Sequence, residues 1–115
     1  MTIADIEDLA CRGESESIEF KRSTGQLGRA AEALCAFLNG RGGSVLVGVS
    51  PDRKIVGQIV NDSTLQDVAQ VLKRFDPAAP IQIHRVPVPD SGHEVLVLEA
   101  NASHESRSFR FDGRP

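Results

Sequence analysis

Residues 36–49 of the chain read AFLNGRGGSVLVGV and join the end of a helix to the beginning of a buried strand. Asn39 and the glycines at 40, 42 and 43 are typical of a helix C-terminus followed by a tight turn, because glycine adopts the left-handed backbone that ends many helices. The run from Ser44 to Val49 is almost wholly apolar, which predicts a central strand covered on both faces. The segment therefore predicts a helix packed against a sheet.

The residues before this segment predict two helices and a strand. Ser23 and Gln26 form a capping-box pattern that opens a helix over 24–39. Its apolar residues recur at helical spacing, as a stripe of Leu27, Ala30, Ala31, Leu34, Phe37 and Leu38. Residues 17–21 alternate between polar and apolar, which favours a strand. A short amphipathic pattern predicts a further helix over 3–11.

The residues after it predict more strands and one more helix. A turn at 51–54 suggests that residues 44–60 form a β-hairpin. A capped apolar pattern predicts a helix over 62–75, and two further strands are predicted at 81–86 and 94–99, on either side of a Pro-Asp-Ser-Gly turn. We therefore expect an α+β fold, in which a mixed sheet of four or five strands carries two main helices and a short N-terminal helix.

The last residues suggest that this domain is part of a longer chain. Phe109 to Phe111 alternates like a strand, and Asp112 with Gly113 is a hairpin turn signal with nothing after it to pair. We expect residues 1–115 to form a single domain excised from a longer protein, whose C-terminal domains would be its partners.

Composition limits the class of protein. The chain has 115 residues, of which 40% are hydrophobic and 25% charged, as in an ordinary globular domain. No apolar run approaches the roughly 18 residues of a membrane span, so no membrane partner is expected. The first twenty residues carry acids where a signal peptide carries bases, which predicts a cytoplasmic location with both cysteines reduced.

The net charge of −3 is unevenly distributed. The first twenty residues hold six acids against one base, whereas the remainder holds twelve bases against ten acids. A polyanion needs a basic face rather than a basic total, so nucleic-acid binding stays open. The histidines and cysteines lack zinc-ligand spacing, and no cofactor is expected.

Three segments carry a family resemblance: residues 13–21 with their Glu…Glu-Phe-Lys pattern, the glycine segment 36–49, and Ile-Val-Gly at 55–57. Together they resemble the Schlafen/AlbA-type DNA-binding domain. In bacteria that domain often begins proteins labelled RecG-related helicases, divergent AAA proteins or transcriptional regulators. The resemblance implies a nucleic-acid-binding N-terminal module, with DNA or RNA as partner.

Some relatives in this family cleave RNA with a carboxylate cluster, so the resemblance also implies an alternative. Glu14 and Glu19 match the two motif glutamates, and Asp52 is the nearest match for the third acid, although it lies later than the usual position. Such carboxylates would hold Mg²⁺ or Mn²⁺ in a metal-dependent endoribonuclease. The competing interpretation is a solvated acidic loop with Glu19 paired to Lys21 or Arg22. We expect the isolated domain not to be catalytic.

Basic residues near these motifs are the leading candidates for nucleic-acid contacts. They are Lys21, Arg22, Arg41, Arg53 and Lys54. Only Phe109 and Phe111 are candidates for stacking on bases, so binding should be mainly to phosphates. A third possibility is a protein-interaction module that forms a homodimer through residues 108–115.

Overall fold

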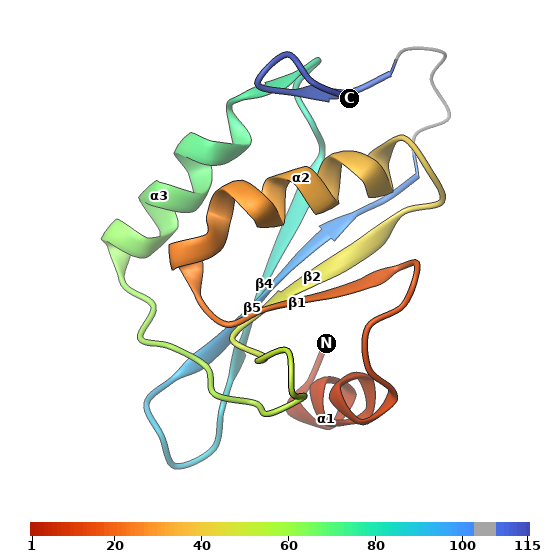
Figure 1. Ribbon diagram of the computed structural model, residues 1–115. Helices are drawn as coiled ribbons and strands as arrows, with labels where there is room; N and C mark the ends of the chain where they lie inside the picture. Colours follow the sequence, from red (N-terminus) through yellow and green to blue (C-terminus); the bar gives the residue numbers. More distant parts are fainter. Residues whose placement is uncertain (103–107) are drawn as a thin grey trace.

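The computed structural model describes residues 1–102 and 108–115 and has an α+β architecture, as predicted (Figure 1). Its helices and strands are α1 (Ile3–Arg12), β1 (Ile18–Lys21), the 3₁₀ turn η1 (Thr24–Gln26), α2 (Leu27–Leu38), β2 (Gly43–Val47), α3 (Asp62–Leu72), β3 (Phe75–Asp76), β4 (Ile81–Pro87), β5 (Glu94–Ala100) and β6 (Arg110–Phe111). None of the helices in this part of the chain is long and apolar enough to cross a membrane.

The four longer strands form one mixed sheet in the order β1-β2-β5-β4. β1 runs parallel to β2, with Ile18 opposite Ser44 and Lys21 opposite Val47. β2 and β4 each pair antiparallel with β5. The two central strands are buried along nearly their whole length, which confirms the prediction from the apolar run that follows the glycine turn.

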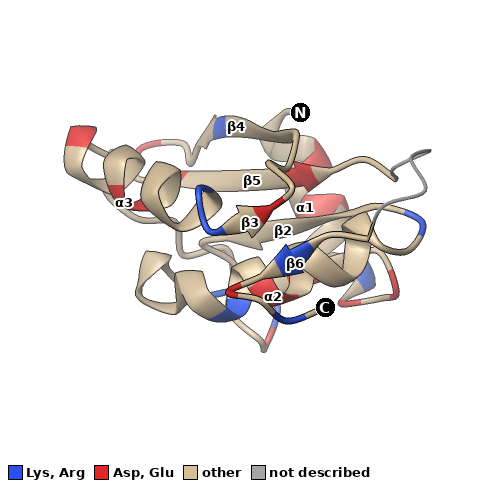
Figure 2. Cartoon of the chain, turned by 90° about the horizontal axis from the view of Figure 1, so that it is seen from above, with Lys and Arg blue, Asp and Glu red and all other residues tan. Residues whose placement is uncertain are grey.

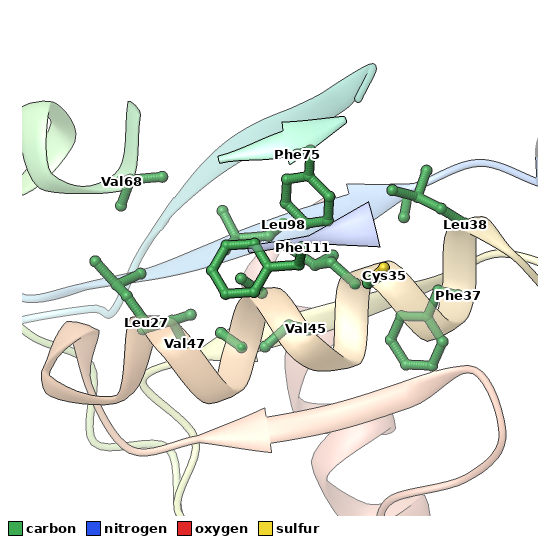
Figure 3. Close-up of a cluster of buried hydrophobic side chains, with 14 of the residues drawn as sticks. Leu27, Cys35, Phe37, Leu38, Val45, Val47, Val68, Phe75, Leu98 and Phe111 are labelled. Atoms are coloured by element: carbon green, nitrogen blue, oxygen red, sulfur yellow. The ribbon is translucent and has the colours of Figure 1, made fainter. Parts of the chain in front are cut away.

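One face of the sheet packs against α2 and α3 (Figure 3). Val45, Val47 and Leu98 point from the sheet into this core, where they meet the apolar stripe of α2 and Val68 of α3. Cys35 lies in the same core and is 1% exposed, as expected for a small structural side chain.

The opposite face is covered by α1 and by the segment that follows β2. Ile6 and Ala10 of α1 pack on Phe20, Leu46 and other sheet residues in a second core. Neighbouring residues on a strand point to opposite faces. Because Phe20 faces α1, Glu19 and Lys21 must therefore face α2.

The predicted hairpin over 44–60 is wrong. Gly48 ends β2 with a φ of +116°, and its carbonyl accepts hydrogen bonds from the backbone N–H groups of both Val56 and Gly57. Residues 55–60 make only isolated bridges, among them Val49 with Ile55. Both sides of β2 are already taken by β1 and β5, so a return strand has no edge of β2 to pair with.

The predictions for the C-terminal residues also need correction. β6 pairs with β3 across the α2 core instead of waiting for a later strand, and Phe111 stacks at a tilt on Phe75 with ring centroids 5.2 Å apart. Phe109 is 4% exposed and Phe111 6%. The turn predicted at Asp112 and Gly113 is present, because Phe111 and Arg114 exchange two backbone hydrogen bonds. Residues 108–115 thus pair within the chain, so the expectation of a strand end with nothing to pair is wrong, whereas dimerisation stays a prediction.

Candidate nucleic-acid interface

The Glu-Phe-Lys motif lies on β1, at one edge of the sheet. The Lys21 ammonium is 3.4 Å from Oε1 of Glu19, so the predicted ion pair within the strand is present. The Lys21 side chain is only 16% exposed, because both residues face α2. Lys21, which the sequence analysis named as a candidate phosphate contact, is therefore already paired with Glu19.

Glu14 lies beside the outer side of β1. Its Oε2 accepts a hydrogen bond from the backbone N–H of Phe20 at 2.9 Å. In a strand, the backbone N–H and C=O of one residue point to the same side, and those of the next residue point to the opposite side. The Lys21 carbonyl points toward β2, because it accepts a hydrogen bond from the backbone N–H of Gly48. The Phe20 N–H therefore points away from the sheet, on the side of β1 where the described residues place no further strand, and the Glu14 carboxylate is its acceptor.

Asp52 belongs to the turn after β2 and is engaged within it. Its carboxylate accepts a hydrogen bond from Ser50 and lies 3.6 Å from the Lys54 ammonium. The hydrogen bond from Ser50 is the main cause that lowers the pKa of the Asp52 carboxyl, and Lys54 adds to it. The turn thus pairs one candidate metal ligand with one candidate phosphate contact.

Arg53 differs from the two lysines because its partner is a carbonyl. Its Nη1 donates to the backbone oxygen of Cys11 at the end of α1, at 3.0 Å. A Cβ added to Gly13 would lie 2.9 Å from an Arg53 guanidinium nitrogen, so the guanidinium rests directly on glycine backbone. The negative end of the α1 dipole also favours a cation here. This contact fixes Arg53 without neutralising it.

Arg22 and Arg41 lie at opposite ends of β1 and β2. Arg22 follows β1 and is exposed, with its backbone N–H bound to Gln26. Arg41 is exposed in the turn that precedes β2. Because the strands are parallel, Arg41 lies near the start of β1, at least four strand residues or roughly 13 Å from its end. Figure 2 shows Lys and Arg segments spread over several elements with acidic segments between them.

Gln58 holds the Arg22 end of β1 in place, and sequence reasoning missed it. Its Oε1 accepts from the Thr24 backbone N–H at 2.8 Å, and its Nε2 donates to the Thr24 hydroxyl at 3.1 Å. Its own backbone exchanges two hydrogen bonds with Glu94. No local pattern marks this residue, because its partners lie more than thirty positions away in the chain.

The three candidate metal ligands are only partly brought together. Glu14 accepts a hydrogen bond from the backbone of β1, and Glu19 is a residue of that strand. Asp52 is instead held in its own turn by Ser50 and Lys54. Within residues 1–102 and 108–115, no group of three or more His, Cys, Asp or Glu side chains is arranged to hold a metal ion.

Phe109 and Phe111, the two candidates for stacking on bases, are both buried. All five phenylalanines of the chain are between 2% and 8% exposed, and the sequence has no Trp or Tyr. Phe111 instead receives the guanidinium of Arg74, which lies 4.8 Å from its ring centroid.

Comparison with known proteins identifies the family. No curated protein matches the sequence. Among solved structures, the DIP2311 protein from Corynebacterium diphtheriae is similar, with a TM-score of 0.57 and 19% identity over 96% of this chain. The chain spans only 23% of that protein's length, and the likeness concerns the fold. The family model described as Schlafen, AlbA_2 matches residues 14–114. Since that match covers nearly the whole sequence, the chain belongs to the Schlafen AlbA_2 family.

Proposed function

We propose that this chain is a nucleic-acid-binding module that attaches a longer protein to DNA or RNA. The Schlafen AlbA_2 family suggests a function related to nucleic acids. A RecG-related helicase-like protein or a transcriptional regulator is the context that the motif resemblance favours. The similar structure supports a modular role, since this fold makes up only part of that chain.

The proposal rests on which cations around β1 are engaged in ion pairs and which are not. Ion pairs engage Lys21 and Lys54, but in the described part of the chain none engages Arg22 or Arg53. Arg53 is held by a carbonyl, so its full charge stays available to a phosphate. Arg22 and Arg53 are exposed, and Lys54 joins them because its side chain stays 78% exposed beside Asp52, so we call these three residues the β1-edge cations.

This set of cations predicts weak binding to the phosphate backbone. Three phosphate contacts on a duplex give a slope of log K against log salt of about −2 to −3. Affinity should then fall about 40-fold between about 50 mM and about 200 mM salt. Because the aromatic side chains are buried, stacking on bases cannot add a contribution to affinity that is independent of salt concentration.

A fluorescence-anisotropy titration tests the proposal with single- and double-stranded DNA and RNA probes. We expect binding at about 50 mM salt and a slope that falls by about 2 in the Arg22→Ala, Arg53→Ala double variant. Lys73→Ala is a matched control, because it removes an exposed cation at the far end of α3. A loss in the control of about half that size, in proportion to the one charge removed, would show that only net charge matters, and absence of binding to every probe would reject the module.

The endoribonuclease stays a second candidate because Glu14 and Glu19 both attach to β1. These carboxylates would hold Mg²⁺ or Mn²⁺, which prefer oxygen ligands. Incubation of the chain with tRNA and Mn²⁺ tests it, with Glu19→Ala as the inactive variant. Equal cleavage by both proteins would show a contaminating nuclease and reject this function.

A further inference from the structure

β4 is the outermost strand of the sheet on the side away from β1. It runs over seven residues, from Ile81 to Pro87, and β5 is its only pairing partner in the described part of the chain. Edge strands of this length present a row of backbone donors and acceptors to other chains. The open side of β4 is therefore a candidate interaction surface.

The register shows which backbone groups point outward. Val88 donates to the His93 carbonyl, so this pair is hydrogen-bonded, and the pattern alternates along an antiparallel pair. Glu94, the next residue of β5, turns its N–H and C=O away from β4 to Gln58, in agreement with that alternation. Residues 82, 84 and 86 therefore bond to β5, whereas 81, 83 and 85 point their backbone groups outward. Of these outward groups, the Ile81 N–H already donates to the Ala79 carbonyl at 3.0 Å.

Side chains on this strand favour contact with a protein. Ile83 is 39% exposed and is one of three large hydrophobic residues exposed in the described residues. Arg85 brings no uncompensated charge, because Glu94 binds its guanidinium at 2.9 and 2.8 Å. An apolar side chain on an open strand edge is a feature that monomeric proteins usually avoid.

We propose that a second copy of this chain adds its own β4 antiparallel to this edge, with the two-fold axis at Ile83. The outward residues 81, 83 and 85 are symmetric about that position. Ile83 then meets Ile83 of the second copy, and Ile81 meets Arg85 of the second copy. Pro80 and Pro87, which lack N–H donors, lie outside the paired segment.

Other registers fit less well. An axis at Arg85 would place two arginines opposite each other and would use Pro87, which has no N–H to donate. An axis at His84 would pair Ile81 with Pro87 and leave each Ile83 against an arginine. An axis at Gln82 would place Ile83 opposite Ile81 of the second copy, but the Ile81 N–H already donates to the Ala79 carbonyl at 3.0 Å, so each of these pairs would lack a donor. The axis at Ile83 brings the two exposed isoleucines together and lets the donors and acceptors of Ile83 serve each other, so the strand is complementary to itself. This self-complementarity identifies the partner as a second copy.

Sedimentation velocity of the 115-residue chain tests the pairing, with circular dichroism to verify folding. We expect a concentration-dependent dimer that Ile83→Asp converts to a monomer, because the charge would lie in the seam. Ile59→Asp is the matched control, since Ile59 is 66% exposed on a loop, and it should leave the dimer intact. A wild-type monomer from about 1 μM to about 1 mM would overturn the proposal.

A disulfide trap tests the register. Residues that face each other in a hydrogen-bonded antiparallel pair have Cα atoms about 5.5 Å apart, within the range of a disulfide. In a Cys11→Ser background, Ile83→Cys should therefore cross-link two copies on mild oxidation, while buried Cys35 stays unreactive. Gln82→Cys should not, because it faces His84 of the second copy. Cross-linking of both variants, or of Gln82→Cys alone, would overturn the Ile83 axis.

Discussion

β1 and β4 occupy equivalent positions at the two ends of one sheet, yet their edges differ in almost every property. β1 has four residues, its outward Phe20 N–H is bound by Glu14, and its flanking segments carry charges. β4 has seven residues and an exposed isoleucine, and in the described residues only the Ile81 N–H of its outward backbone groups is hydrogen-bonded, to the Ala79 carbonyl. A strand edge closed by a carboxylate cannot easily add another strand, whereas an open apolar edge can.

The comparison gives the Glu…Glu-Phe-Lys motif a structural meaning in this chain. Glu14 closes the edge, Phe20 anchors the strand in the α1 core, and Glu19 pairs with Lys21 on the α2 side. Each residue of the motif thus has a partner that stabilises β1. The charge available to a ligand comes from residues outside the motif, namely the β1-edge cations Arg22, Arg53 and Lys54.

The largest difference between the edges should appear on truncation of an apolar side chain. Phe20 is 2% exposed, so Phe20→Ala should lower the free energy of unfolding by about 3–5 kcal/mol. Ile83→Ala should cost about 1 kcal/mol or less at low protein concentration, because that side chain is already partly in water. Urea unfolding of both variants measures this, and equal losses would show that β4 is as firmly buried as β1.

The next effect concerns the glycine beneath Arg53. Gly13 has a φ of +85° and a ψ of 178°, a conformation that other residues rarely adopt, so Gly13→Ala should cost about 1–3 kcal/mol. Gly28→Ala, where nothing lies within 4 Å of the added carbon in α2, should instead stabilise by about 1 kcal/mol. Thermal unfolding compares the two. A neutral Gly13→Ala would show that the guanidinium does not need this close approach.

Removal of the edge-closing carboxylate should have a smaller effect. Glu14→Ala leaves the Phe20 N–H without its protein acceptor, at a cost of about 1–2 kcal/mol, whereas Glu14→Gln keeps an acceptor and should cost less. Glu16→Ala, an exposed acid in the same loop, controls for charge. Urea unfolding that gives the same result for Glu14→Ala and Glu16→Ala would mean that the closed edge contributes nothing.

The smallest effect concerns acid titration beside β4. Hydrogen bonds from Arg85 lower the pKa of the Glu94 carboxyl in the folded chain. The stability from this pair is therefore present above the ordinary glutamate pKa of about 4.3 and is lost as pH falls through the lower folded pKa. Glu94→Gln should be less stable than wild type at neutral pH, and the difference should shrink toward pH 3, as unfolding curves can measure. A difference constant with pH would contradict the ion pair.

Sequence patterns predicted most elements because they depend on local periodicity. The stripe of α2, the apolar run of β2 and the strands β4 and β5 all appear near their expected positions. The return strand over 55–60 failed because the neighbours of β2 come from distant parts of the chain. β3 was missed because two residues are too few to show a period, and Phe75 extended the helical pattern instead.

The candidate site was less predictable for the same reason. The Glu19–Lys21 pair follows from two residues on one strand face, and it was expected. The contact of Arg53 with Cys11 spans 42 positions, and the hydrogen bonds of Gln58 with Thr24 span 34. Such contacts depend on how α1 and the segment after β2 pack together, which no local pattern encodes.

The division of roles between the two edges is tested most directly by sedimentation velocity with a fluorescently labelled oligonucleotide at low salt. The account predicts that Ile83→Asp sediments as a monomer and still binds the oligonucleotide. It predicts that the Arg22→Ala, Arg53→Ala double variant loses the oligonucleotide and still dimerises. If either variant lost both properties while remaining folded, the two edges would not act separately, and the account would be contradicted.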